Sequence, residues 1–282
     1  MSIAFLFPGQ GSQHTGMGED FFSRFPETVA EADGILGYSV TELCLSPENS
    51  ERLGQTQFTQ PALYVVSCLQ AMTEQEEGGE APAFAAGHSV GEYTALRVAG
   101  AFSFGDGLRL VAKRGEIMSK VSGGGMAAVI GLEPEKIQEV LTVQEADGVD
   151  LANFNSPRQT VLSGPASSIE SLGPSIKEAG AKLFVPLKVS GAFHSRMMEG
   201  PARKFAAFLE GFTFAKPAFP VISNVEASPY PDAESIAELL VRQIHSAVRW
   251  TNTIQYLRKQ GVADFLECGP GRVLTKLLRQ IP

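Results

Sequence analysis

The sequence holds few of the residues on which disulfide-stapled, metal-bound and membrane-spanning proteins depend. Its 282 residues include 3 cysteines, Cys44, Cys68 and Cys268, which are scattered and odd in number. This pattern is unlike a disulfide framework or a metal site, so we expect no metal and a reducing, cytoplasmic location. No apolar run approaches the roughly 18 residues that a membrane span requires. The apolar stretch 3–7 has no basic region before it, which predicts a first strand rather than a signal peptide.

The sequence also contains fewer basic than acidic residues. The 23 Lys and Arg residues are outnumbered by 31 Asp and Glu residues, so the formal net charge is −8. Proteins that bind nucleic acid generally need a basic surface, so nucleic acid is not expected as a partner. The chain lacks the G-K-[ST] ending of a phosphate-binding loop. Its glycines at 123 and 125 precede a predicted strand, whereas a dinucleotide fingerprint opens a helix.

One short motif carries a clear chemical meaning, the hexapeptide GHSVGE at 87–92. It matches G-x-S-x-G, the pattern of a serine on a sharp turn between a strand and a helix. The flanking residues fit this turn, because 83–86 suit a short buried strand and 92–98 suit a helix. Ser89 is then expected at a helix N-terminus, where free backbone N–H groups favour negative charge. A small Gly/Ser turn without chemistry is the alternative, and the strand and helix favour the nucleophile.

Hydrophobic periodicity divides the chain into an outer part and an inserted part. Between 123 and 188 the predicted order is strand, helix, strand, strand, helix, strand, which is the ferredoxin-like unit. The predicted fold class is α/β, with an α/β-hydrolase-like large subdomain at 1–122 and 189–282 and a ferredoxin-like small subdomain inserted at 123–188. In the large subdomain, strands are predicted at 3–7, 83–86, 220–225 and 263–268, and helices from about 17, at 60–75, 92–98 and 106–121, after His194, on both sides of Trp250, and at the end.

A serine nucleophile needs a general base, and the chain offers 4 histidines. His14 lies in a polar loop, and His88 adjoins Ser89 on a tight turn, where neighbouring side chains point apart. His194 lies in a loop that follows a predicted strand and precedes a helix, a place where α/β folds carry their sites. His245 suits the order of an ordinary α/β-hydrolase, in which the histidine comes late, but we favour His194 as the base.

Eight motifs, spread over nearly the whole chain, resemble those of the malonyl-CoA:acyl-carrier-protein transacylases and occur in that family's order. They are FPGQGSQ, TQPAL, GHSVGEY, LVAKRGEIM, NFNSPRQTVLSG, GAFHS, QIHSAVRW and ECGPGRVL. The motif GAFH, with a phenylalanine before the histidine, resembles the corresponding motif of the acyltransferases that serve polyketide synthases. A free-standing chain of this kind resembles the trans-acting acyltransferases of modular polyketide assembly.

The resemblance implies malonyl transfer in two half-reactions, with malonyl-CoA as substrate and no bound cofactor. Ser89 attacks the thioester while His194 takes its proton, and the phosphopantetheine thiol of an acyl carrier protein then attacks the malonyl ester. The kinetics are expected to be ping-pong. The backbone N–H groups of Gln10 and Val90 are implied to hold the oxyanion. A carbonyl of Gln243 is implied to orient His194, and if it is the backbone carbonyl, substituting Gln243 is expected to do little.

The resemblance also implies which residues select the acyl group. Arg114 is implied to bind the free malonyl carboxylate, since a guanidinium binds a carboxylate bidentately. Phe193 is expected to narrow the pocket against an α-methyl branch, which favours malonyl over methylmalonyl. Gln60 and Asn155 match pocket positions of the family, and purely structural amides are the alternative for both.

Three alternatives to this function stay open. The first is a hydrolase on the same scaffold, either an ordinary esterase that uses His245 or an enzyme that clears stalled acyl chains. The second is a transferase for a different extender unit, such as methylmalonyl. The third is a non-catalytic interaction module, which an intact set of Ser89, His194 and Arg114 argues against.

The acidic balance bears on the carrier protein as a partner. Carrier proteins are generally acidic, so a chain of net charge −8 needs a local basic patch for docking. The candidates that flank the predicted cleft are Lys182, Lys188, Arg196, Arg203 and Lys204, and a solvated charged face is the alternative.

Overall fold

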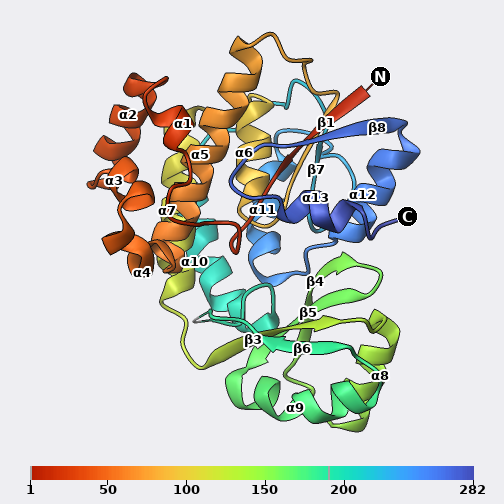
Figure 1. The fold of residues 1–282 in the computed structure, drawn as a ribbon. Coiled ribbons are helices and arrows are strands. Elements are labelled where there is room, and N and C mark those ends of the chain that lie inside the picture. The colour runs from red at the N-terminus through yellow and green to blue at the C-terminus, as the bar shows by residue number, and fades with distance from the viewer. Residues whose placement is uncertain (1, 190) are drawn as a thin grey trace.

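Two four-stranded β-sheets organise the chain, as Figure 1 shows. The computed structural model describes residues 2–189 and 191–282. The first sheet lies in the larger part of the molecule with most of the helices. The second sheet, with α8 (Pro134–Val143) and α9 (Ala166–Glu178), forms the lower end in this view.

The first sheet is parallel and is buried on both faces. Its strands are β1 (Ser2–Phe7), β2 (Phe84–Gly87), β7 (Val221–Ile222) and β8 (Val262–Glu267), in the order β7-β2-β1-β8. Side chains along β1 alternate between two hydrophobic clusters, because Phe5 and Phe7 belong to one and Ala4 and Leu6 to the other. Helices therefore cover both faces, as is usual for parallel strands.

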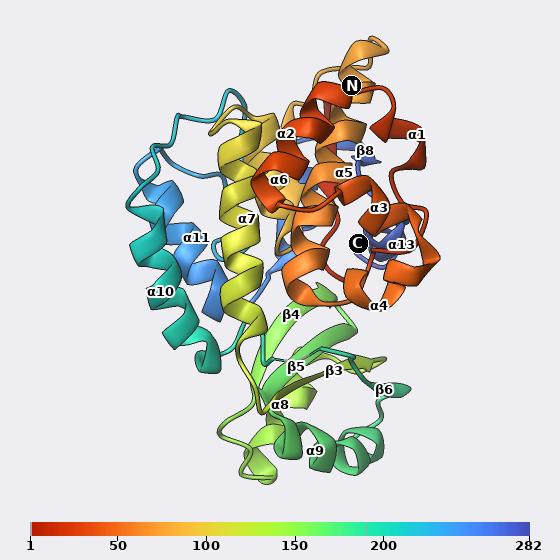
Figure 2. The ribbon, with the colours of Figure 1, turned by 90° about the vertical axis from the view of Figure 1, so that its left-hand side faces the viewer.

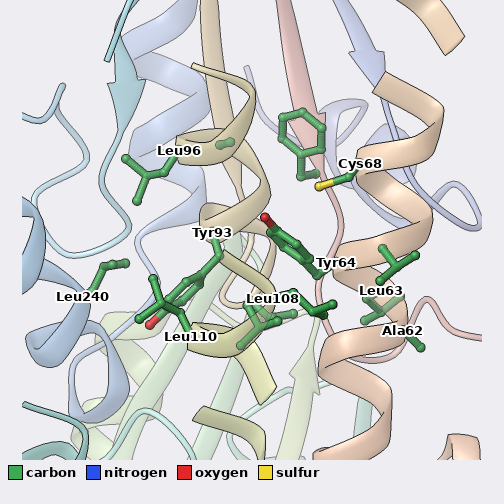
Figure 3. Packing of buried hydrophobic residues seen from close by; sticks show 14 of the residues in the cluster. Ala62, Leu63, Tyr64, Cys68, Tyr93, Leu96, Leu108, Leu110 and Leu240 are labelled. Atoms are coloured by element: carbon green, nitrogen blue, oxygen red, sulfur yellow. The ribbon is translucent and has the colours of Figure 1, made fainter. Parts of the chain in front are cut away.

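The main hydrophobic core lies on one face of this sheet. The helices over it are α5 (Thr56–Glu76), α6 (Gly91–Val98), α7 (Phe104–Ser119), α10 (Glu199–Leu209) and α11 (Ser235–His245). Figure 2 shows α5, α7 and α10 side by side, and Figure 3 shows Tyr64, Tyr93 and Leu108 packed between the helices. Burying one such side chain stabilises the fold by roughly 1.5–3 kcal/mol. The opposite face is covered by α12 (Trp250–Lys259) and α13 (Val273–Leu278).

The second sheet is antiparallel and has helices on one face. Its strands are β3 (Gly124–Ile130), β4 (Asp150–Ser156), β5 (Gln159–Pro165) and β6 (Leu183–Pro186), in the order β4-β5-β3-β6. The element order β3-α8-β4-β5-α9-β6 is the ferredoxin-like order predicted above. On β3, Ala127 and Val129 pack under the helices, whereas Met126 and Ala128 belong to the main core. The two parts of the molecule thus share apolar contacts where they meet.

The structure differs from the sequence prediction between β1 and α5. Only a helix from about residue 17 is predicted there, but the segment folds into α1 (Glu19–Phe22), α2 (Pro26–Leu36), α3 (Val40–Leu45), η1 (Pro47–Asn49) and α4 (Ser50–Leu53). Helix α5 begins at Thr56, not at 60, and contains Pro61. Pro61 lacks an N–H, which removes one helical hydrogen bond. The helix continues through it because residues 59–69 around it are buried in the core.

Three further observations concern the residues that the structure describes. None of their helices is both long enough and apolar enough to cross a membrane. No group of three or more His, Cys, Asp and Glu side chains among them is placed to hold a metal ion. Cys44, Cys68 and Cys268 are buried free thiols. Burial raises the pKa of Cys68 to about 11, so this thiol is protonated and unreactive at neutral pH.

Candidate active site

A strained turn between β2 and α6 presents Ser89. Its backbone has φ 52°, in the left-handed region that residues with a Cβ rarely adopt. Two glycines allow the turn, because a Cβ on Gly87 would overlap the backbone of Gly91, and one on Gly91 would overlap the carbonyl oxygen of Phe7. The chain therefore makes the sharp strand–turn–helix connection that G-x-S-x-G predicts.

His194 lies opposite this serine and forms a dyad with it. The Ser89 Oγ is 2.8 Å from His194 Nε2. The Nδ1 of His194 lies 2.8 Å from the backbone oxygen of Gln243 and 3.2 Å from that of Ser246. Carbonyl oxygens only accept, so Nδ1 carries the proton and Nε2 accepts from the serine hydroxyl. His194 itself has φ 58°, so both members of the dyad have a strained backbone.

The surroundings of His194 keep its imidazole neutral. The side chain is buried, and burial together with the nearby charge of Arg114 lowers its pKa to about 3. An imidazole with this pKa is unprotonated at neutral pH, so the lone pair of Nε2 is free to accept the hydrogen bond of the Ser89 hydroxyl. The arrangement can therefore deprotonate the Ser89 hydroxyl as a general base.

Arg114 reaches the dyad from α7. It is 0% exposed, and its Nη2 donates to Ser89 Oγ at 3.1 Å and to Gln243 Oε1 at 2.9 Å. Its Nη1 donates to Gln60 Oε1 at 2.8 Å, and its guanidinium carbon lies 5.6 Å from the ring centroid of Tyr93. Within the described residues its Nε–H has no hydrogen-bond partner. Burial lowers the pKa of Arg114, but a guanidinium remains charged at neutral pH, so this is a buried cation with unused donor capacity.

A small cavity of about 90 Å³ opens beside the Ser89 side chain. Five of the residues singled out from the sequence line it besides the dyad, namely Gln10, Gln60, Val90, Arg114 and Phe193. The remaining wall is mostly apolar. It includes Met118 from α7, beside the first sheet, and Met126 from β3 of the second sheet. The cavity therefore combines an apolar wall with one buried cation, which suits a short acyl group that ends in an anion.

Gln10 and Val90, whose backbone N–H groups are implied by the family resemblance to hold the oxyanion, both line this cavity. Gln10 lies in the loop after β1, and its side chain donates to Thr56 Oγ1 at 3.2 Å. Val90 precedes the first residue of α6. Among the described residues neither backbone N–H has a hydrogen-bond partner, so both are free to bind an oxygen anion.

The other amides predicted to bind substrate take different places. Gln60 lines the cavity and fixes Arg114, as described above. Asn155 differs from the prediction, because its Oδ1 lies 2.8 Å from His88 Nε2 and it is not among the residues that line the cavity. Asn153 lines the cavity instead. The pairing of β4 shifts register between Leu151 and Asn153 and again further along, which a strand pattern does not reveal.

Gln243 has a larger part than the sequence suggests. Its backbone carbonyl orients His194, as implied, but its side chain also belongs to the site. The Nε2 donates to the backbone oxygen of Ser89 at 2.9 Å and to Glu92 Oε2 at 2.5 Å, while Oε1 accepts from Arg114. The side chain thus joins three groups of the site, so substituting Gln243 is now expected to have a larger effect than a backbone role alone implies.

Sequence reasoning missed three residues behind the serine, namely Glu92, Asn224 and Tyr230. Asn224 accepts from the Ser89 N–H at 2.7 Å and donates to the oxygen of Gly87 at 2.6 Å. Glu92 is 0% exposed and accepts from Tyr230 at 2.5 Å. Burial raises the pKa of Glu92 to about 7. The position of Glu92 directly after the elbow was the one available sequence signal for this group.

The remaining histidines are not part of the dyad. His14 Nδ1 lies 3.2 Å from the backbone oxygen of Ser12, and the ring of His88 packs against Trp250 at 5.6 Å. His245 is the last residue of α11 and lines a larger cavity of about 480 Å³ on the other side of His194. The choice of His194 as the partner of Ser89 agrees with this geometry.

The candidate basic patch divides into paired and unpaired residues. Arg196 holds Asp150 of β4, with Nη2 2.5 Å from Oδ1, and Arg203 lies 4.0 Å from Glu199. Lys182, Lys188 and Lys204 are exposed and have no ion-pair partner among the described residues. Leu187 and Val189, on either side of Lys188, line the cavity beside Ser89. Of these three lysines, Lys188 therefore follows β6 within the cavity wall, whereas Lys182 precedes β6 and Lys204 lies on α10.

The sequence is similar to known acyltransferases over nearly its whole length. The sequence matches the acyl transferase domain family over residues 4–281. It is 53% identical over 279 residues to the polyketide biosynthesis protein ThaF of Burkholderia thailandensis. The aligned region covers 99% of this chain and 24% of ThaF. It is 49% identical over 282 residues to the polyketide biosynthesis malonyl CoA-acyl carrier protein transacylase PksC of Bacillus subtilis, covering 99% of this chain and 96% of PksC.

A solved structure is similar over the whole chain. It is that of a malonyl-transacylase in complex with a type II PKS acyl-carrier protein, with a TM-score of 0.95 and 43% identity, covering 100% of this chain and 93% of that one. The chain thus spans about a quarter of ThaF and nearly all of PksC. The family resemblance of the eight motifs is confirmed: the chain belongs to the acyl transferase domain family, among the malonyl CoA-acyl carrier protein transacylases.

Proposed function

We propose that this protein transfers a malonyl group from malonyl-CoA, through an ester on Ser89, to the phosphopantetheine thiol of an acyl carrier protein. The observation that carries the proposal is the buried Arg114, whose Nη2 lies 3.1 Å from the Ser89 hydroxyl. A cation so close to a nucleophile suits an acyl group that is short and ends in a carboxylate. Malonyl has both properties.

The first half-reaction uses the dyad. His194 Nε2 takes the Ser89 proton as Oγ bonds to the thioester carbonyl carbon, and the oxyanion lies at the N–H groups of Gln10 and Val90. The C–S bond then breaks, and the proton passes from His194 to the CoA thiolate. Malonyl remains as an ester on Ser89, and no cofactor is needed for this step.

The second half-reaction reverses these steps with a different thiol. The phosphopantetheine thiol gives its proton to His194 and attacks the ester carbonyl, and Ser89 leaves with that proton. Because CoA departs before the carrier protein reacts, the kinetics are ping-pong. Water is a competing acceptor, so the small volume of the cavity, about 90 Å³, favours transfer over hydrolysis.

Selection of the acyl group follows from two residues of the cavity. A neutral acyl group would leave the guanidinium of Arg114 without an anionic partner in a buried site, which penalises acetyl relative to malonyl. Phe193 is 6% exposed and lines the same cavity, so it restricts the room for an α-methyl branch. One methyl group is usually worth ~1–3 kcal/mol, so discrimination against methylmalonyl is expected to be partial.

The role in the cell and the division of the chain belong to the same proposal. The names of ThaF and PksC support a role in polyketide biosynthesis, and the family also serves fatty-acid synthesis. We place the reaction in the cytoplasm. We assign the catalytic dyad to a large subdomain of 1–122 and 189–282 and the β6 side of the cleft to a small subdomain of 123–188, in keeping with the two separate sheets.

Intact-protein mass spectrometry tests this function directly. The protein is mixed with malonyl-CoA, methylmalonyl-CoA or acetyl-CoA, and an acyl carrier protein is then added. We expect a malonyl adduct that is absent in Ser89→Ala and that moves to the carrier thiol. Free malonate without an adduct would indicate a hydrolase, and no adduct with any of the three thioesters would refute the proposal.

A further inference from the structure

One buried carboxylate in the site takes no direct part in the reaction described above. Glu92 lies in the first turn of α6, three residues after Ser89, and is 0% exposed. Burying a carboxyl group is costly unless hydrogen bonds satisfy it. Three donors converge on it: the Tyr230 hydroxyl at 2.5 Å and the Asn224 backbone N–H at 3.2 Å reach Oε1, and Gln243 Nε2 reaches Oε2 at 2.5 Å.

The contact with Gln243 decides which way that amide faces. Its Nε2 donates to Glu92 and to the backbone oxygen of Ser89, and its Oε1 accepts from Arg114 Nη2 at 2.9 Å. If the amide were reversed, its oxygen would face two acceptors and its NH₂ would face the donor of Arg114. An acceptor at the position of Glu92 Oε2 therefore holds the oxygen of Gln243 against the guanidinium.

The contact of Glu92 with Asn224 stabilises the strained turn at Ser89. The backbone N–H of Asn224 donates to Glu92, while its side chain accepts from the Ser89 N–H at 2.7 Å and donates to Gly87 at 2.6 Å. Ser89 keeps a φ of 52° only if its surroundings over-determine that conformation. Asn224 accepts from the backbone N–H of Ser89, and Gln243 donates to its backbone oxygen. Glu92 accepts hydrogen bonds from both Asn224 and Gln243.

We propose that Glu92 is a positioning residue of the acyl-transfer site, which fixes the amide of Gln243 and the backbone of Asn224 and so holds Arg114 and Ser89 in register. The inference rests on the proposed malonyl transfer for the role of Arg114. It requires an acceptor at the reach of a glutamate side chain and not a negative charge, because each contact is a hydrogen bond from a neutral donor.

Two substitutions separate reach from charge. Glu92→Gln keeps the length and one carbonyl oxygen, so it still accepts from Gln243, while its NH₂ donates to the Tyr230 hydroxyl and gives up only the longer contact, the 3.2 Å bond from the Asn224 N–H. Glu92→Asp keeps the charge but is one methylene shorter and withdraws the carboxylate from Gln243. Glu226→Gln is the control, because Glu226 is an exposed carboxylate two residues after Asn224, paired with Arg242 at 2.7 Å.

The readouts are the ratio of kcat/KM for malonyl-CoA to that for acetyl-CoA, the rate of Ser89 labelling by a fluorophosphonate, and thermal unfolding. In Glu92→Asp we expect the malonyl/acetyl ratio and the labelling rate each to fall by at least about tenfold, the loss that one hydrogen bond to a charged group produces. In Glu92→Gln both should stay within about threefold of the unsubstituted protein, and in Glu226→Gln they should not change.

Two results would overturn the inference. One is the reverse order, with Glu92→Asp close to the unsubstituted protein and Glu92→Gln impaired, because the charge would then be what matters. The other is a lowered unfolding temperature in Glu92→Asp with an unchanged malonyl/acetyl ratio and labelling rate, which indicates a purely structural group. Failure of the proposed function looks different, since the unsubstituted protein would then form no malonyl adduct while fluorophosphonate labelling would still report on Glu92.

Discussion

At the residue scale, the site depends on three side chains that are costly to keep in place. Ser89 and His194 both have a positive φ, and Arg114 is a cation without exposure to solvent. Such features persist only where neighbouring contacts hold them, and they are typical of sites rather than of ordinary core positions. Their cost is offset by the extensive main core around α5, α6 and α7.

Arg114→Ala tests the assignment of the carboxylate site. The change removes the guanidinium that would bind the malonyl carboxylate, and hydrogen bonds to charged groups contribute ~1.5–3 kcal/mol each, so the loss of a bidentate contact should lower kcat/KM for malonyl-CoA by at least about 100-fold. The value for acetyl-CoA should fall much less. Arg109→Ala is the control on the same helix, since Arg109 is exposed and pairs with Asp106. Equal losses for the two thioesters would argue against a role in selection.

The pH profile tests the state of His194. The base works when it is neutral, which is above its pKa, and burial and the charge of Arg114 lower that pKa to about 3 from the ~6.5 of a free histidine. The rate of fluorophosphonate labelling should therefore stay level as the pH falls through 6.5 and decline only below about pH 4. In Arg114→Ala the acidic limb should move to higher pH. A midpoint near pH 6.5 in the unsubstituted protein would contradict the buried, neutral imidazole.

At the scale of secondary-structure elements, the decisive feature is the close approach of β2 and α6 to the end of β1. Gly91 allows this approach, because a Cβ there would overlap the carbonyl oxygens of Phe7 and Pro8. The loop after β1 carries Gln10, so the same contact that closes the turn at Ser89 also brings Gln10, the second residue of the proposed oxyanion site, to the cavity. One glycine thus governs two parts of the site.

Gly91→Ala should separate these elements. We expect a loss of about 2–4 kcal/mol in the free energy of unfolding and a loss of Ser89 labelling, since the overlap is with backbone that cannot move cheaply. Gly34→Ala in α2 is the matched control, because a Cβ there has open space around it. That change should raise the free energy of unfolding by about 0.5–1 kcal/mol, as alanine suits a helix better than glycine. Urea unfolding measures both, and a stable, labelled Gly91→Ala protein would contradict the close approach.

At the scale of the whole molecule, the net charge and the local charge act in opposite directions on an acidic partner. The net charge of −8 repels an acidic partner at long range, whereas Lys188 lies exposed between two residues of the cavity wall, and Lys182 lies exposed at the other end of β6. Arg196 is not equally available, because it pairs with Asp150. Attraction of a carrier protein therefore has to come from a local field, and local fields are screened by salt.

Reversing the charge of both lysines tests this arrangement. In Lys182→Glu/Lys188→Glu, transfer from the malonyl enzyme to a carrier protein should slow by about tenfold at low salt, and the difference should shrink as salt is added. Formation of the malonyl ester from malonyl-CoA should change much less. Lys259→Glu/Lys276→Glu, on α12 and α13, makes the same change in net charge and is the control. An equal slowing in this control would mean that only the overall charge matters.

The sequence by itself determined the features that depend on short spacing. The glycines of GHSVGE sit two residues to either side of Ser89, which permits a tight turn around the serine, and the strand-forming and helix-forming residues that flank the motif predicted that turn. The alternation of apolar residues between 123 and 188 likewise predicted the order of β3, α8, β4, β5, α9 and β6. The segment 17–55 escaped prediction because its helices are short and have few periodic positions.

How the site is held depends on contacts between distant parts of the chain. Asn224 and Tyr230 reach Ser89 and Glu92 across 135 and 138 residues of chain, and Gln243 reaches Glu92 across 151. These residues meet because β7 pairs with β2 and α11 packs beside α10, and no local pattern records either event. A motif can specify a nucleophile because backbone geometry is local. The network that positions the nucleophile consists of buried polar contacts between distant segments, and these exist only once the core has formed.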